Sequence, residues 1–93
     1  MMKDSILTLH PEKKRGVNIS REKYEMIHKA ILTSLRAQKE MTFMDLSRAV
    51  EKQLNGKFEG SVMWYVTTVK LDMEARGTIK RVCNSRPQLL RLI

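Results

Sequence analysis

Apolar residues recur at helical spacing in three segments of the chain. From residue 20 to about residue 38 they fall at Tyr24, Ile27, Ile31 and Leu35. In the second segment they are Phe43, Leu46, Val50 and Leu54, and in the third Val62, Val66, Val69 and Met73. Steps of three and four residues bring side chains to one face of a helix, so the spacing predicts three helices that share a core.

Residue types at the ends of these segments agree with three helices. Ser20, Thr42 and Ser61 each precede a helical segment, where a hydroxyl can accept a hydrogen bond from a free backbone N–H. Gly56 and Gly77 follow the second and third segments, where a helix end favours a residue with positive φ. These signals predict helices over about 21–38, 43–54 and 62–76.

Short strands are expected beside the helices. Residues 78–82 and 88–92 are β-prone, and the turn residues Asn84, Ser85 and Pro87 between them predict a hairpin. Met41 to Phe43 is expected to pair with the edge of this hairpin. Residues 1–19 are interpreted as an extended arm, with Leu9 and His10 before Pro11 and a charged turn at 12–16. No strand is expected before the first helix.

The resulting order of helix, short strand, helix, turn, helix and hairpin resembles the winged helix-turn-helix superfamily. The stretch from Val69 to Ile79, with Gly77 as the helix end, resembles the last part of the recognition helix in many bacterial regulators of this fold. Residues 16–19 and 64–72 also resemble a group of small uncharacterised bacterial winged-helix-like proteins, which implies no activity. The expected fold is mainly α with a small β-hairpin: an arm at 1–19, then a winged-helix domain at 20–93 with three helices and a two- or three-stranded wing sheet.

A second apolar stripe on the third predicted helix departs from that resemblance. Helical geometry places four residues on one line beside the core stripe: Trp64, Thr68, Leu71 and Ala75. A tryptophan is costly to leave in water, so we expect a cover over this stripe. The cover is either the arm, through Leu7, Leu9 and Val17, or a second copy of the chain in a homodimer.

The net charge of the chain suggests a candidate binding partner. The chain has 18 Lys and Arg against 10 Asp and Glu, a net charge of +8. Residues 61–93 hold six basic and two acidic residues, so this last third carries +4, half of the excess. A localised basic excess favours polyanions, and double-stranded DNA first among them.

The winged-helix resemblance implies that the third helix and the wing would contact DNA. The candidate residues are Ser61, Trp64, Thr67, Thr68, Lys70, Arg81 and Arg86. Hydroxyls and backbone N–H groups at a helix start can bind phosphate, threonines can meet base edges, and the cations can meet phosphates. The helix holds no arginine before Arg76, so we expect weak, mainly electrostatic binding. The alternative interpretation is that these cations lie on a solvent-exposed face and do not contact DNA.

A protein-interaction or dimerisation module is the rival function. Trp64 and Leu71, if exposed, form an apolar patch of the kind that binds partner proteins. Winged-helix modules often serve as docking units, so the same fold is compatible with a role without DNA.

Catalysis finds little support in the sequence. His10 and His28 have no acid or cysteine at the spacing of a metal site or a catalytic triad, and Asp72 and Glu74 fall on different sides of a helix. Cys83 is the single cysteine, which excludes an internal disulfide. We therefore expect no enzyme, cofactor, metal or small-molecule substrate. No apolar run reaches the length of a membrane span, and a cytoplasmic location is expected.

Overall fold

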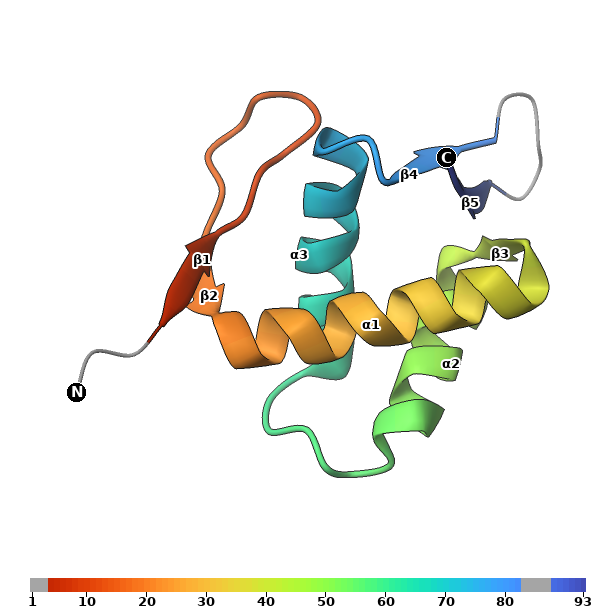
Figure 1. Cartoon of the computed structure of the whole chain (residues 1–93), viewed down its shortest axis with the longest axis horizontal. Coiled ribbons are helices and arrows are strands. Elements are labelled where there is room, and N and C mark those ends of the chain that lie inside the picture. Colours follow the sequence, from red (N-terminus) through yellow and green to blue (C-terminus); the bar gives the residue numbers. More distant parts are fainter. Residues whose placement is uncertain (1–3, 83–87) are drawn as a thin grey trace.

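The fold combines three helices with two small antiparallel sheets. The structure is a computed structural model that describes residues 4–82 and 88–93. Within these ranges the helices are α1 (Arg21–Gln38), α2 (Phe43–Leu54) and α3 (Val62–Ala75). The strands are β1 (Ser5–Leu7), β2 (Asn18–Ser20), β3 (Glu40–Thr42), β4 (Ile79–Arg81) and β5 (Leu89–Leu92). The protein is therefore a small domain that mixes α and β structure (Figure 1).

The three predicted helices and their caps are confirmed. The hydroxyls of Ser20, Thr42 and Ser61 accept hydrogen bonds from the backbone N–H groups three residues later, at 3.4, 3.1 and 3.2 Å. Gly56 and Gly77 follow α2 and α3 with φ of 77° and 79°. A side chain disfavours such angles, so glycine suits both positions, and α2 is capped one residue earlier by Asn55, which is also left-handed with φ of 44°.

The C-terminal sheet also agrees with the prediction. Its strand order is β3-β5-β4, so the strand between α1 and α2 pairs with the last strand of the chain. Met41 lies opposite Leu90, and Arg81 lies opposite the same residue on the other side. The expected edge pairing of Met41 to Phe43 is thus confirmed for Met41 and Thr42. The predicted turn at 83–87 lies outside the described residues.

The core lies where the three helices and the C-terminal sheet meet. α3 crosses α1, and α2 packs against both (Figure 1). The fully buried apolar side chains come from all three helices and from β4: Ile27, Ile31, Leu35, Leu46, Val50, Val66, Val69, Met73 and Ile79. The inward stripe predicted for α3 is thus buried at three of its four positions, and Val62 is half-buried.

A β-hairpin precedes α1, and the expectation that no strand lies there is wrong. β1 and β2 pair antiparallel, with Ile6 opposite Ile19. Beyond the strands, the Thr8 hydroxyl donates to the Val17 carbonyl oxygen at 3.0 Å and accepts from the Val17 N–H at 3.1 Å. Strands of three residues are too short to show an alternating pattern, and residues 8–17 separate them, so the sequence carries no hairpin signal of the usual kind.

This N-terminal hairpin is continuous with the helical part. Ile19 is buried in the core, and β2 runs directly into α1. The Arg21 N–H donates to the Asp4 carbonyl oxygen, and the two side chains form an ion pair at 2.7 Å. The boundary expected between residues 19 and 20 therefore falls inside β2.

Gly16 provides a test of the N-terminal hairpin. A Cβ atom on this residue would lie 1.6 Å from the Thr8 carbonyl oxygen, which is backbone and cannot move aside freely. We expect Gly16→Ala to lower the free energy of unfolding by about 1–3 kcal/mol, as overpacking does, and to remove hydrogen-exchange protection at the Val17 amide. Asn18→Ala, on the exposed side of β2, is the control and should change neither. Parent-like stability and protection in Gly16→Ala would contradict this packing.

Candidate nucleic-acid interface

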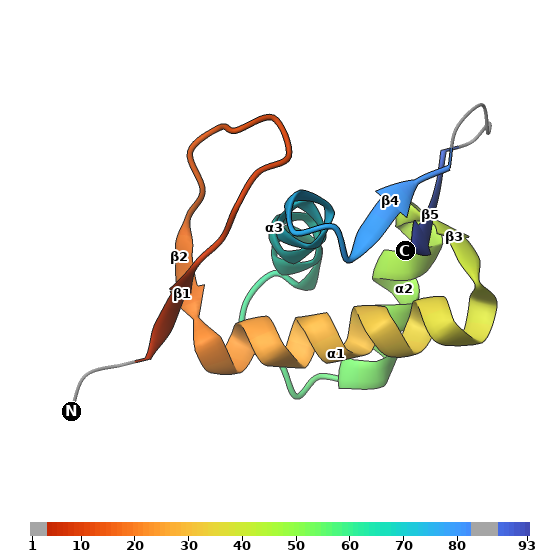
Figure 2. The same cartoon turned by 45° about the horizontal axis from the view of Figure 1, so that its top comes forward.

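α3 lies between two β-hairpins. Figure 2 views this helix nearly end on, with β1-β2 on one side, β4-β5 on the other and α1 below. Figure 1 shows the same order from another direction. The side of α3 that faces away from α1 is therefore flanked by a hairpin on each side.

The predicted contact residues in the first half of α3 lie at or near the surface. Ser61 is exposed, Thr67 and Thr68 are half-buried, and Trp64 keeps 47 % of its surface exposed. Two hydroxyls already have backbone partners, because Ser61 caps the helix and Thr67 donates to the Met63 carbonyl oxygen at 2.8 Å. Each of these oxygens can still accept one further hydrogen bond.

The predicted cations on the second half of α3 and on β4 are engaged in ion pairs. The Lys70 ammonium lies 3.6 Å from Glu74 and over the Phe43 ring, and its side chain is only 12 % exposed. Burial lowers the pKa of Lys70, and the Glu74 carboxylate partly opposes this effect. Arg81 also pairs with Glu74, at 3.0 Å, but its side chain is 48 % exposed. Arg81 is thus accessible to a phosphate and Lys70 is not, while Arg86 lies outside the described residues.

The second apolar stripe of α3 is only partly covered. The expectation that the N-terminal segment covers it is wrong for Trp64, which makes a T-shaped contact with the Tyr65 ring and keeps 47 % of its surface exposed. Leu71 is half-buried, and it lines a small groove with Thr68, Leu9 and Val17. The N-terminal hairpin therefore lies beside the later part of the stripe and does not extend over its first turn.

The contact that fixes the hairpin beside α3 involves Asp72, which the sequence did not single out as a site. Its side chain is fully buried and accepts hydrogen bonds from the Tyr24 hydroxyl at 2.5 Å, the Leu9 N–H at 2.8 Å and Arg76 Nε at 2.9 Å. The four-residue spacing of Asp72 and Arg76 is the only sequence signal for this group. Asp72 therefore joins α3 to α1 and to the N-terminal hairpin.

Two titratable groups of α1 respond to this environment. Burial, together with the hydrogen bond to Asp72, raises the pKa of Tyr24, so the phenol stays protonated and remains a donor. His28 stacks on the Tyr24 ring with centroids 5.4 Å apart, and burial lowers the pKa of this histidine.

Asp72 and Glu74 bind different partners, as their positions on different sides of the helix predict.

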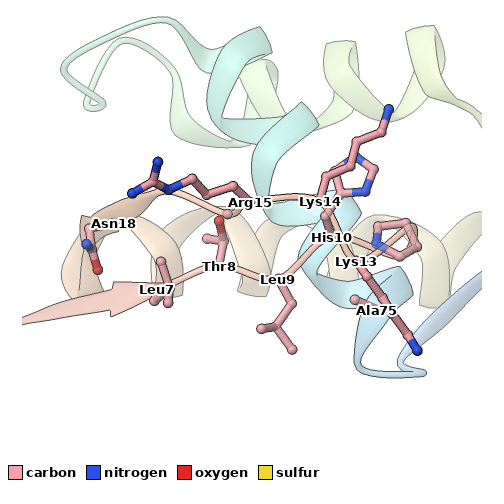
Figure 3. Close-up of a pocket in the computed structure, with 11 residues that line it drawn as sticks. Leu7, Thr8, Leu9, His10, Lys13, Lys14, Arg15, Asn18 and Ala75 are labelled. Atoms are coloured by element: carbon pink, nitrogen blue, oxygen red, sulfur yellow. The ribbon is translucent and has the colours of Figure 1, made fainter.

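The loop of the N-terminal hairpin is a second basic element, which the sequence treated only as a charged turn. Lys13, Lys14 and Arg15 are exposed, and Figure 3 shows their charged ends directed away from one another. The three residues and Ala75 of α3 line the same cavity. The turn before them is closed by hydrogen bonds from the Lys13 N–H to the His10 carbonyl oxygen and from the Glu12 N–H to His10 Nδ1. These cations lie on the side of α3 opposite to β4.

Other kinds of site are not evident in the described ranges. Among residues 4–82 and 88–93, no three His, Cys, Asp or Glu side chains gather as a metal site would require. In the same ranges, no helix has both the length and the apolar character that crossing a membrane takes.

The chain belongs to a family of unknown function, DUF6958, whose model matches residues 5–90. The match includes the N-terminal hairpin, the three helices and most of the C-terminal sheet. No curated protein and no solved structure matches the chain.

Asp72→Asn tests the contact between α3 and the N-terminal hairpin. The substitution keeps the size of the side chain but removes its charge, so the bonds from Tyr24 and Arg76 weaken. We expect the free energy of unfolding to fall by about 1.5–3 kcal/mol, the range for a hydrogen bond to a charged group, and the Leu9 amide to lose hydrogen-exchange protection. Asp45→Asn removes an exposed partner of Arg48 and should cost less than about 1 kcal/mol. Equal losses in the two variants would show that Asp72 has no special role.

Proposed function

We propose that this member of the DUF6958 family is a winged-helix domain that binds duplex DNA weakly and mainly through charge. The observation that carries the proposal is an open helix face flanked by two hairpins, in a chain of net charge +8. The proposed role is that of a binding module without a catalytic centre.

The order of the elements supports the winged-helix assignment. A helix, a short strand, two further helices and a hairpin follow one another from α1 to β5. The first strand of this series, β3, pairs with the last, β5, and β4 lies on the far side of β5. In this assignment α3 is the recognition helix and β4-β5 is the wing.

The dimensions of α3 suit a DNA groove. An α-helix with its side chains is about 10–12 Å across, close to the roughly 12 Å width of the major groove. With α3 in the groove, Trp64, Thr67 and Thr68 would face the bases, and elements on either side of the helix would face the phosphate backbones. Thr67 and Thr68 offer a methyl group for thymine and a hydroxyl for base edges.

The charges favour binding with little sequence preference. Arginine bound to guanine is the commonest specific contact, and the face of α3 formed by Trp64, Thr67, Thr68 and Leu71 carries no cation. Arg81 on β4 and Lys80 beside it are exposed and can meet phosphates. Such contacts contribute affinity but do not read the sequence.

Salt dependence tests this proposal. Binding of a short random-sequence duplex, followed by fluorescence anisotropy, should weaken with salt with a log–log slope of about −3.6 or steeper, as expected for four or more phosphate contacts. Arg81→Ala with Arg86→Ala should reduce the slope by roughly 1.8, since two contacts are lost. Lys70→Met is the control, because its cation is buried against Glu74, and the slope should not change. Absence of binding at low salt would refute the proposal.

A homodimer through the same helix face is a second candidate function. Met63 and Trp64 are 48 % and 47 % exposed, which is unusual for large apolar side chains on one helix turn. A two-fold interface pairs a surface with itself, so a face without charge avoids repulsion between two chains of net charge +8. These two observations favour a second copy as the occupant.

Sedimentation velocity over a range of protein concentrations tests the homodimer. If α3 forms the interface, the parent should dimerise, and Leu71→Glu should remain a monomer because it places a charge in the contact. Thr33→Glu adds the same charge on the exposed side of α1 and should dimerise like the parent. A parent that sediments as a monomer at every concentration would exclude this candidate.

A further inference from the structure

The loop of the N-terminal hairpin holds three cations in a row, and the proposed function above assigns no contact to any of them. Lys13, Lys14 and Arg15 are all exposed. Lys14 lies 3.7 Å from Glu12, a pair that is open to solvent on both sides and therefore weak. Within residues 4–82 and 88–93, no ion pair involves Lys13 or Arg15.

The cations nearest to α3 contrast with those of the loop. Lys70 and Arg81 share the Glu74 carboxylate, and Arg76 binds Asp72. Each of these cations already has a carboxylate partner, so a phosphate would have to compete with it. Among the described residues, the loop cations have no carboxylate partner other than the exposed Glu12, a property that they share with the exposed Lys80 on β4.

The loop is also held in place. The Leu9 N–H donates to the buried Asp72 on α3, and the Thr8 hydroxyl bridges to Val17 across the start of the loop. Gly16 allows the two sides to approach closely, since a Cβ there would collide with Thr8. The backbone that carries the cations is therefore fixed to the recognition helix of the proposed function, so binding has to order the side chains but not the loop itself.

We propose that this loop is a second wing, whose Lys13, Lys14 and Arg15 bind phosphate oxygens of duplex DNA on the side of α3 opposite to β4-β5. The inference rests on the proposed function and adds a contact element to it. With α3 in the major groove, the hairpins on its two sides face the two strands that border that groove (Figure 2). Each of the two DNA strands is then contacted by its own basic hairpin.

A triple substitution in the loop tests the second wing. In the intact chain, Lys13→Ala, Lys14→Ala and Arg15→Ala together should reduce the log–log salt slope for a random-sequence duplex by roughly 2.7, three contacts at about 0.9 each. The control triple Lys29→Ala, Arg36→Ala and Lys52→Ala makes the same change in net charge at exposed positions of α1 and α2, and should keep the parent slope. Lys13→Arg with Lys14→Arg retains the charges and should also keep it.

The outcomes separate this inference from the function on which it rests. If the parent binds DNA and the loop triple keeps its slope, the second wing is wrong while the proposed function stands. An equal decrease in the loop triple and in the control triple also overturns it, because the effect is then one of net charge. If the parent does not bind duplex DNA, both proposals fail together.

Discussion

Asp72 is a fully buried carboxylate, and the position of the N-terminal hairpin depends on it. A charge in the interior is costly unless hydrogen bonds and an opposite charge replace the lost water. Here the replacements come from three places: Tyr24 on α1, Arg76 at the C-terminal end of α3 and the Leu9 N–H in the hairpin loop. Because the hairpin supplies one of the three donors, its detachment would leave Asp72 Oδ1 with Arg76 Nε as its remaining partner. The carboxylate thus links the stability of the hairpin to that of the helical core.

This link also shapes the surface around α3. The helix buries Val66, Val69 and Met73 on one side and presents Trp64, Thr67 and Leu71 on the other, so its outward face is largely uncharged. Positive charge lies beside the helix instead, on β4 and on the loop that Asp72 anchors. In the proposed complex, the uncharged face enters the groove and the basic hairpins contact the backbone, which gives affinity without strong sequence preference.

The sequence predicts the helical part well because local signals determine it. Ser20, Thr42 and Ser61 act as caps through their own hydroxyls, and Gly56 and Gly77 adopt the positive φ that their residue type favours. The hairpin before α1 escapes prediction because its strands have only three residues each and because the contact that holds it against α3 is distant in the sequence. Leu9 and Asp72 are 63 residues apart, and no local pattern reports that pairing.

The sequence predicts where the candidate site lies, but it does not predict which of the charged side chains there are accessible to a ligand. Trp64, Thr67 and Thr68 lie near the surface of α3, as helical spacing suggests. From the sequence alone, Lys70 is an equally reasonable phosphate contact. In the structure its ammonium is buried between the Glu74 carboxylate, one helical turn later, and the ring of Phe43. Whether a cation is accessible depends on tertiary packing, so the exposed Lys13 and Arg15 emerge as candidates only once the hairpin is seen beside α3.

The central claim is that α3 and both hairpins form one DNA-binding face. Its most direct test is to map the backbone amide NMR shifts of the intact chain as random-sequence duplex is added at low salt. The account predicts shifts in three places: the loop at residues 12–16, the outward side of α3 around Thr67, and β4. The exposed side of α1 around Lys29 and Thr33 should not shift. Shifts confined to α1, or no shifts at all, would contradict the account.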